Sequence, residues 1–255
     1  MNNAVLYAVN DSVAVITINR PESRNAISEE VRVGLFDALR RFNQDPQAAV
    51  AILTAAGDKA FCAGMDLKAM AAADGQLPPW REFLPVIGVS IHVDKPVIAA
   101  INGAARAGGW LLAQMCDLCV AAEHATFAIT EVKVGRGVPW SAPLARMLGQ
   151  RLYMELVLTG DAIDARRARE IGFVNHVVPA SELMEKSIAL ARRIAQNAPL
   201  SVRAARELVY LCGEMGTNAA LRAADHLFAP VYASEDAVEG PLAFREKRQP
   251  VWRGR

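Results

Sequence analysis

The stretch Pro96–Leu112, PVIAAINGAARAGGWLL, constrains the fold of this 255-residue chain more than any other. It begins as an apolar, β-rich run of the length that a buried strand needs. The pair Asn102–Gly103 is expected to end the strand, because both residue types tolerate the positive φ of a sharp turn. The small residues Ala107–Gly109 then precede an apolar helix that we predict over Trp110–Cys116. A buried strand, a turn and a helix start therefore follow one another directly.

The start of that helix has two interpretations. Unpaired N–H groups and the helix dipole favour an anionic oxygen there, and glycines allow the oxygen to approach the backbone. Alternatively, Gly108 and Gly109 serve only to pack the helix closely on the strand. The stretch is not a dinucleotide fingerprint, because it lacks the G-x-G-x-x-G spacing.

A second glycine-containing turn favours the first interpretation. The stretch Gly57–Leu67, GDKAFCAGMDL, follows another buried-strand pattern at Val50–Leu53. Two strand ends that each turn into a helix through glycine can present two backbone amides to one oxygen. Such a pair stabilises an oxyanion that develops during a reaction.

The composition of the chain excludes several classes of function. A formal net charge of +1 gives no general attraction to nucleic acid or to membranes. No apolar run approaches the length that crosses a bilayer, and the N-terminus MNNAVLYAVND lacks the basic start and apolar core of a secretion signal. We therefore expect a cytoplasmic protein with no nucleic-acid or membrane partner.

The four cysteines do not predict a metal site. Cys116 and Cys119 have the C-x-x-C spacing, but no second pair or nearby histidine completes a zinc ligand set. Buried, reduced thiols in a cytoplasmic protein are the favoured interpretation.

Hydrophobic periodicity predicts strands that alternate with helices, followed by helices alone. This order favours an α/β core over residues 1–195 and a C-terminal helical region over residues 196–255. The strands are expected at Val5–Val9, Val13–Ile18, Ala49–Thr54, Asp117–Ala122, Thr126–Ile129 and Phe173–Val178, besides the central one.

Several helix boundaries follow from capping residues. Ser28, Ser181 and Ser234 are each expected to N-cap a helix, because a serine oxygen accepts a hydrogen bond from an otherwise unpaired N–H group. A mixed apolar helix, bent or delayed by Pro85, is predicted over Trp80–Ile91. The preceding segment, residues 69–79, is expected to form a lid beside a pocket.

The two glycine-containing stretches closely resemble the oxyanion-hole segments of the crotonase, or enoyl-CoA hydratase/isomerase, family. RPESRNAI at Arg20–Ile27 and LTGDAIDARRAREIGFVNHVV at Leu158–Val178 also match, as do SEDAVEG and FREKRQP near the C-terminus. The similarity covers nearly the whole chain in the right order. It implies a spiral of ββα units with a C-terminal helical region that assembles trimers, often paired as hexamers.

The resemblance also implies roles for individual residues. The N–H groups of Met65 and Gly108 would form the oxyanion hole, and Glu131 would be the catalytic carboxylate. From its apolar neighbours alone, Glu131 is equally well a partnered structural acid or a working one.

Coenzyme A is expected as part of a thioester substrate, with no permanently bound cofactor and no metal. The resemblance implies CoA contacts at Arg24, Asn25, Ala26, Ala63, Asp66, Leu67, Phe244 and Lys247. Each of three of these has a plainer alternative. Arg24 is otherwise a solvated loop charge, Asp66 a helix N-cap, and Phe244 a surface aromatic that packs locally.

One position departs from the family pattern. Typical hydratases carry a second glutamate two residues after the last glycine of the second motif, where this chain has Leu111. No acidic residue lies between Asp94 and Asp117, so an alignment shift does not restore it. The pair of carboxylates that positions and activates water is therefore incomplete. Trp110, beside Leu111, is expected to add bulk near the water site.

These residues favour isomerisation slightly. An oxyanion hole and one glutamate suffice to remove a proton from one carbon of a thioester enolate and return it to another. Hydration or dehydration of an unusual acyl group, with Glu131 acting alone, is the first alternative. A weakly catalytic acyl-CoA-binding protein is the second.

Overall fold

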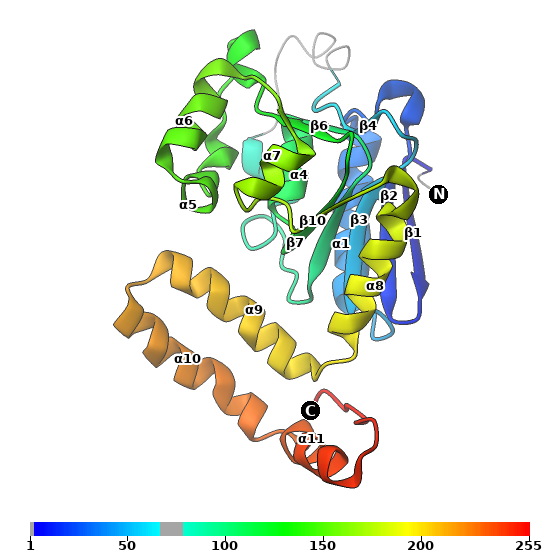
Figure 1. Cartoon of the computed structure of the whole chain (residues 1–255), viewed down its shortest axis with the longest axis vertical. Coiled ribbons are helices and arrows are strands. Elements are labelled where there is room, and N and C mark those ends of the chain that lie inside the picture. The colour runs from blue at the N-terminus through cyan, green and yellow to red at the C-terminus, as the bar shows by residue number, and fades with distance from the viewer. Residues whose placement is uncertain (1–2, 67–78) are drawn as a thin grey trace.

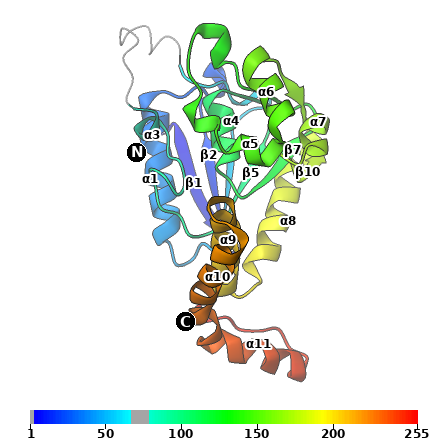
Figure 2. The ribbon, with the colours of Figure 1, turned by 90° about the vertical axis from the view of Figure 1, so that its left-hand side faces the viewer.

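The computed structural model describes residues 3–66 and 79–255. Leu67 and residues 69–78 of the expected lid lie outside the described residues. No helix in the described ranges is long and apolar enough to cross a bilayer. The α/β body occupies one end of the molecule and the last three helices extend from the other (Figures 1 and 2).

A six-stranded sheet forms the centre of the α/β body, in the order β1-β2-β3-β5-β7-β10. Its first two strands pair antiparallel and the others pair parallel. The strands are β1 (Val5–Asn10), β2 (Val13–Ile18), β3 (Val50–Ala55), β5 (Val97–Ile101), β7 (Leu118–Ala122) and β10 (His176–Val178). Helix α8 covers one face, and α1 lies behind the other (Figure 1). Because both faces are covered, β3 and β5 are buried along their whole length, and the one polar side chain in them, Thr54, donates a hydrogen bond to the Ala100 carbonyl at 2.9 Å.

A second, four-stranded sheet stands at the end of the first, in the order β4-β6-β8-β9. Its strands are β4 (Ala60–Cys62), β6 (Ala104–Arg106), β8 (Thr126–Ala128) and β9 (Ile163–Asp164). Three times in succession, a strand of the large sheet is followed in the chain by a strand of the small one: β3–β4, β5–β6 and β7–β8. This repetition is the ββ part of the expected ββα spiral.

Helices fill the remainder of the described chain. The α-helices are α1 (Glu29–Gln44), α3 (Trp80–Phe83), α4 (Gly108–Gln114), α5 (Leu144–Leu148), α6 (Gln150–Thr159), α7 (Ala165–Glu170), α8 (Leu183–Ala195), α9 (Pro199–Glu214), α10 (Thr217–Tyr232) and α11 (Glu235–Glu246). Short 3₁₀ helices are η1 (Pro21–Ser23), η2 (Glu131–Val134), η3 (Pro139–Ser141) and η4 (Ala180–Glu182).

Two of the three predicted N-caps are confirmed. The Ser28 hydroxyl accepts a hydrogen bond from the Val31 amide, and the Ser234 hydroxyl accepts one from the amide of Ala237. The prediction for Ser181 is wrong, because this residue already lies inside η4, which runs directly into α8. A side chain within helical backbone cannot reach the free N–H groups that a cap satisfies.

The predicted helix over Trp80–Ile91 is also wrong, since α3 ends at Phe83. Leu84 is extended, with φ −131° and ψ 151°. This conformation is the one that a following proline imposes, because the ring of Pro85 clashes with helical backbone at the residue before it. The Ser90 hydroxyl then accepts a hydrogen bond from the Val86 amide at 2.9 Å and holds the next turn.

The turn after β5 forms for a different reason than predicted. Neither Asn102 nor Gly103 has a positive φ. Glycine is needed there for space, since a Cβ atom on Gly103 would lie 2.7 Å from the backbone of Lys59 and Ala60. The positive φ falls instead at Ala107, with φ 49° and ψ −119° just before α4.

The C-terminal helices bury few side chains. Helices α9 and α10 form an antiparallel hairpin, and α11 lies beyond it at the far end of the molecule (Figures 1 and 2). Asp117 anchors α9 to the α/β body: its Oδ1 accepts hydrogen bonds from Arg206 Nε at 2.7 Å and from the Tyr210 hydroxyl at 2.6 Å. Its Oδ2 accepts from the Val97 amide at the start of β5.

Candidate active site

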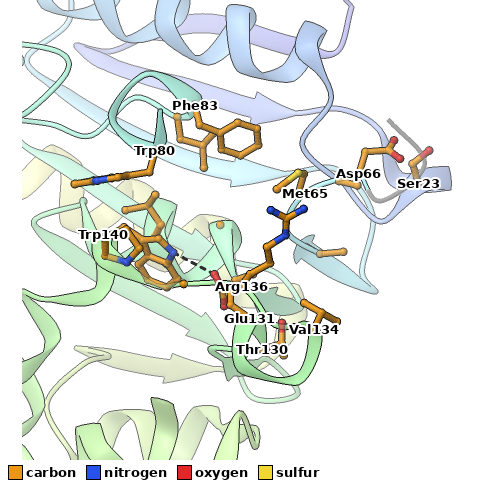
Figure 3. Close-up of a pocket in the computed structure, with 18 of the residues that line it drawn as sticks. Ser23, Met65, Asp66, Trp80, Phe83, Thr130, Glu131, Val134, Arg136 and Trp140 are labelled. Atoms are coloured by element: carbon orange, nitrogen blue, oxygen red, sulfur yellow. Dashed lines mark hydrogen bonds between the residues drawn. The ribbon is translucent and has the colours of Figure 1, made fainter. Parts of the chain in front are cut away.

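A cavity of about 750 Å³ lies where the two glycine-containing turns meet the segment from η2 to η3. Met65, Gly108, Leu111 and Glu131 all line it. Four positions that the sequence singled out for one site are therefore brought together. Figure 3 shows Glu131 and Trp140 joined by a hydrogen bond, with Trp80 and Phe83 above them and Met65 and Asp66 farther along the cavity.

The amide of Met65 is presented by a short parallel bridge to Ile27. The Ile27 amide donates to the Gly64 carbonyl at 2.8 Å, and the Asp66 amide donates to the Ile27 carbonyl at 3.2 Å. In this pattern the N–H and C=O of the intervening residue point away from the partner strand. The Met65 N–H therefore points away from Ile27. This cavity-lining residue does not use its N–H in the pairing with Ile27.

The amide of Gly108 is the first of helix α4, where backbone N–H groups have no acceptor within the helix. A Cβ atom on Gly108 would lie 2.7 Å from Ile27 Cδ1, and one on Gly109 would overlap the carbonyl of Cys62. Both glycines therefore pack α4 closely, and this packing places the helix start beside the Met65 turn. The two interpretations of the glycine pair are complementary.

Glu131 begins η2 and is half-buried. Its Oε1 accepts a hydrogen bond from Trp140 Nε1 at 3.1 Å, whereas Oε2 is buried and has no partner among the described residues. Burial raises the pKa of this carboxyl above its ordinary value, and that rise is opposed by its own backbone amide, by the hydrogen bond from Trp140 and by the backbone of Thr130.

Leu111 faces the cavity, but Trp110 does not. Leu111 lines the cavity and is only 3% exposed. The ring of Trp110 packs between Phe127 and Phe173, with centroid separations of 5.6 and 5.2 Å. The expectation that Trp110 adds bulk near a water site is therefore wrong, because packing against these two rings turns its side chain into the core.

One end of the cavity is aromatic, which was not predicted from the sequence. Trp80, Phe83 and Trp140 line it together with Leu84. These residues come from α3 and η3, which are far apart in the sequence. No sequence pattern indicated this aromatic end, because all four tryptophans lie outside the predicted strands.

Four of the residues expected to contact CoA line one or both of two cavities. Ala26, Ala63 and Asp66 line the cavity, and Asp66 lies 3.6 Å from Arg20 in an ion pair. Arg24 and Ala63 line an adjacent cavity of about 700 Å³, together with Lys59, Arg106 and His124. This second cavity carries mainly positive charge, as a phosphate-bearing ligand requires.

The Asn25 side chain is occupied inside its own loop. Its Nδ2 donates to the carbonyls of Ala56 and Ala60 at 2.9 and 2.8 Å, and its Oδ1 accepts from the Arg20 amide. The Asn25 backbone amide also donates, to the Arg20 carbonyl at 2.8 Å. Among its polar groups, the backbone carbonyl is therefore the one left for the expected CoA contact.

Phe244 and Lys247 stand apart from this site. They lie in and just after α11, at the opposite end of the molecule from α4 and β4 (Figures 1 and 2). The Phe244 side chain is 87% exposed. Within one copy of the chain, neither residue reaches the cavity.

Comparison with known proteins decides the family. A family model described as enoyl-CoA hydratase/isomerase matches residues 8–255. The chain belongs to the enoyl-CoA hydratase/isomerase, or crotonase, family. The carnitinyl-CoA dehydratase of Escherichia coli (strain K12) is 40% identical over 267 residues, and the alignment covers 100% of both chains.

Solved structures of the crotonase family share the whole fold. A probable enoyl-CoA hydratase/isomerase from Mycobacterium abscessus aligns with a TM-score of 0.90 and 37% identity over 100% of both chains. Enoyl-CoA hydratase from Mycobacterium tuberculosis H37Rv aligns with a TM-score of 0.89 and 37% identity over 99% of both. The predicted family and fold class, an α/β crotonase spiral with C-terminal helices, are confirmed.

Membership makes this protein a crotonase-family enzyme that acts on an acyl-CoA thioester. The preference for isomerisation is not supported, since the names of the relatives include a dehydratase, a hydratase and a hydratase/isomerase.

Proposed function

We propose that this enzyme catalyses the reversible dehydration of a 3-hydroxyacyl-CoA, with Glu131 as the only acid/base. One observation carries the proposal: Oε2 of Glu131 is buried and unpartnered, in the cavity that Met65 and Gly108 also line. A carboxylate so placed has one oxygen available for a proton on the substrate.

The reaction balances with one carboxylate. Glu131 Oε2 removes the proton from the carbon next to the thioester carbonyl, and the electron pair moves onto the carbonyl oxygen. The amides of Met65 and Gly108 stabilise that enolate oxygen, a contribution of about 3 kcal/mol for one well-placed donor. When the electrons return, the bond from C3 to its hydroxyl oxygen breaks. Glu131 delivers its proton to the departing oxygen, which leaves as water.

The CoA portion of the substrate is assigned to the Arg24 side of the site. Ala63 lies at the junction of the two cavities and lines both. A thioester at Met65 and Gly108 would direct its phosphates past Ala63 toward Arg24, Lys59 and Arg106. Guanidinium and ammonium groups are suited to phosphate oxygens.

Dehydration is preferred over isomerisation because of the full-length similarity to a carnitinyl-CoA dehydratase. Isomerisation is the second candidate, favoured by Leu111, because α4 then lacks the second carboxylate that would position water beside Glu131. Both reactions share the enolate and the same proton acceptor, and they differ only in whether C3 carries a leaving group.

The aromatic end of the cavity supports an acyl group that carries a quaternary ammonium, as a carnitinyl group does. Trp80 and Phe83 offer ring faces that attract a cation. The Arg81 guanidinium already lies 5.0 Å from the Trp80 ring centroid, so only the other face of that ring is free for a substrate.

The test compares three thioesters by mass and chromatography. Carnitinyl-CoA, its neutral isostere 3-hydroxy-5,5-dimethylhexanoyl-CoA and a 3-enoyl-CoA are incubated separately with the enzyme. We expect loss of water from the first two, with the cation preferred. Migration of the double bond in the 3-enoyl-CoA, without loss of water from either hydroxy substrate, would replace dehydration by isomerisation. Tight binding of these thioesters without turnover would indicate an acyl-CoA-binding protein instead of an enzyme.

We further propose that residues 196–255 assemble the chain into a homotrimer, or a hexamer of two trimers. Helices α9 to α11 expose large apolar side chains, among them Val209, Leu221, Tyr232, Val238 and Phe244. Burial of these in a neighbouring copy would also bring Phe244 and Lys247 toward a CoA site. Light scattering on the purified chain tests this: a monomer at micromolar concentration would refute it.

A further inference from the structure

The hydrogen bond between Trp140 and Glu131 distinguishes the two oxygens of the carboxylate. Trp140 Nε1 donates to Oε1 at 3.1 Å, and the indole is only 7% exposed. Oε2 is buried with no partner among the described residues. An indole N–H can donate a hydrogen bond but cannot accept one.

This asymmetry fixes where a proton can reside. Once Glu131 has taken a proton from the substrate, the acid has one O–H and one bare oxygen. A proton on Oε1 would face the N–H of Trp140, donor against donor. The proton therefore favours Oε2, the oxygen that also removed it, and is available there for return to the same substrate.

We propose that Trp140 is a positioning residue: its indole N–H holds Glu131 Oε1 so that Oε2 alone exchanges protons with the substrate. The inference rests on the proposed role of Glu131 as the acid/base, but it holds for dehydration and isomerisation alike. With no second carboxylate at Leu111, the orientation of this single group controls the whole proton transfer.

The surroundings of Glu131 contain other charged groups. Glu22, Asp66 and Arg136 also line the cavity. Lys133 on η2 pairs with Asp161 at 2.8 Å, and the neighbouring helix α6 carries Arg151 and Glu155. Substitution of Trp140 leaves all of them in place, so a change in the titration of Glu131 would report the loss of the indole N–H.

Two variants separate the N–H group from the bulk of the ring. Trp140→Phe keeps an aromatic ring without a donor. Trp140→His keeps a ring nitrogen at the corresponding position without the larger ring. We expect kcat to fall about tenfold or more in Trp140→Phe with little change in KM, because misorientation of a catalytic group costs up to about 100-fold. Trp140→His is expected to retain more activity than Trp140→Phe.

The pH profile provides a second measurement. The Trp140 hydrogen bond favours the carboxylate, so its loss raises the pKa of Glu131. The acid limb of kcat/KM is therefore expected at higher pH in Trp140→Phe. Trp110→Phe is the matched control, because the Trp110 Nε1 is buried without a partner among the described residues and lies outside the cavity. Its acid limb is expected to coincide with that of the wild type.

One further experiment distinguishes an error about Trp140 from an error about the proposed role of Glu131. Exchange of the α-proton of butyryl-CoA in D₂O, followed by mass spectrometry, measures proton removal without any elimination or isomerisation. If the wild type exchanges this proton and Glu131→Gln exchanges it at the same rate, Glu131 is not the acid/base. If Glu131→Gln abolishes exchange while Trp140→Phe matches the wild type in rate and pH profile, the inference about Trp140 is wrong. Higher activity in Trp140→Phe than in Trp140→His would assign Trp140 to packing alone and overturn it too.

Discussion

Helix α4 and the segment from η2 to η3 border the same cavity, but they contribute to it in different ways. Residues Gly109–Ala113 are buried, and in the proposed mechanism α4 contributes the backbone amide of Gly108. By contrast, η2 buries none of its side chains fully, and it supplies the carboxylate of Glu131.

The difference reflects the chemistry asked of each segment. An oxyanion hole requires donors that do not move, and backbone amides locked in a core provide this without any particular side chain. A proton carrier must change its charge during each cycle, so it cannot be sealed in a fully apolar core. The partly exposed position of Glu131, with a hydrogen bond from Trp140, fits the proton transfer proposed for it.

Removal of the carboxylate is expected to have the largest effect. Glu131→Gln preserves shape but cannot take up a proton, so kcat should fall by about 1000-fold, while the Kd for an acyl-CoA changes little. Steady-state kinetics and calorimetric binding measure the two quantities. Activity within tenfold of the wild type would remove Glu131 from the mechanism.

Substitution in helix α4 is expected to change stability and activity through packing. A Cβ on Gly109 overlaps the Cys62 carbonyl, so Gly109→Ala should reduce the free energy of unfolding by about 1–3 kcal/mol and lower activity by displacing the Gly108 amide. The control is Gly137→Ala on the other segment, where the nearest atom to a new Cβ is 3.8 Å away. Its stability should change by about 0.5 kcal/mol or less. Denaturant unfolding measures both variants. Equal losses of unfolding free energy in Gly109→Ala and Gly137→Ala would contradict the difference in packing between the two segments.

A carboxylate added to α4 tests whether the missing acid limits water chemistry. Leu111→Glu places an ionisable group at a buried position and should destabilise the fold by about 1–3 kcal/mol. Relative to Leu111→Gln, which has the same size without charge, it should add water to a 2-enoyl-CoA faster. Equal hydration rates in the two variants would show that Glu131 alone suffices.

The smallest effect concerns stability and pH. Burial raises the folded-state pKa of Glu131 above its ordinary value of 4.5, so the folded state binds this proton more tightly than the unfolded state. Ionisation of Glu131 therefore lowers stability as pH rises through the folded-state pKa. Glu131→Gln should melt above the wild type at pH 8, and the difference should vanish well below pH 4.5. A difference that does not depend on pH would contradict this account.

The sequence predicted the parts of the molecule that depend on local patterns. Ser28 and Ser234 cap their helices because the capping contact spans only a few residues. The apolar runs at Val50–Ala55 and Val97–Ile101 are buried strands because both faces of the sheet are covered. The convergence of Met65, Gly108 and Glu131 was predicted from resemblance to a family.

The errors concern features that tertiary packing determines. Nothing local distinguishes Trp110, which packs against Phe127 and Phe173, from Trp140, which donates to Glu131. The direction of each indole depends on residues distant in the sequence. The helix predicted over Trp80–Ile91 failed at Pro85 because periodicity was given more weight than the restriction on the residue before a proline.

Ala107 has a consequence for which sequences this site can accept. Its φ of 49° belongs to a region that side chains disfavour, at a cost of about 1–3 kcal/mol. Glycine would be tolerated at this position without that cost, whereas Gly109 has no room for alanine. Exchange between alanine and glycine is therefore tolerated in one direction only: Ala107 can become glycine, but Gly109 cannot become alanine without displacing the Cys62 backbone.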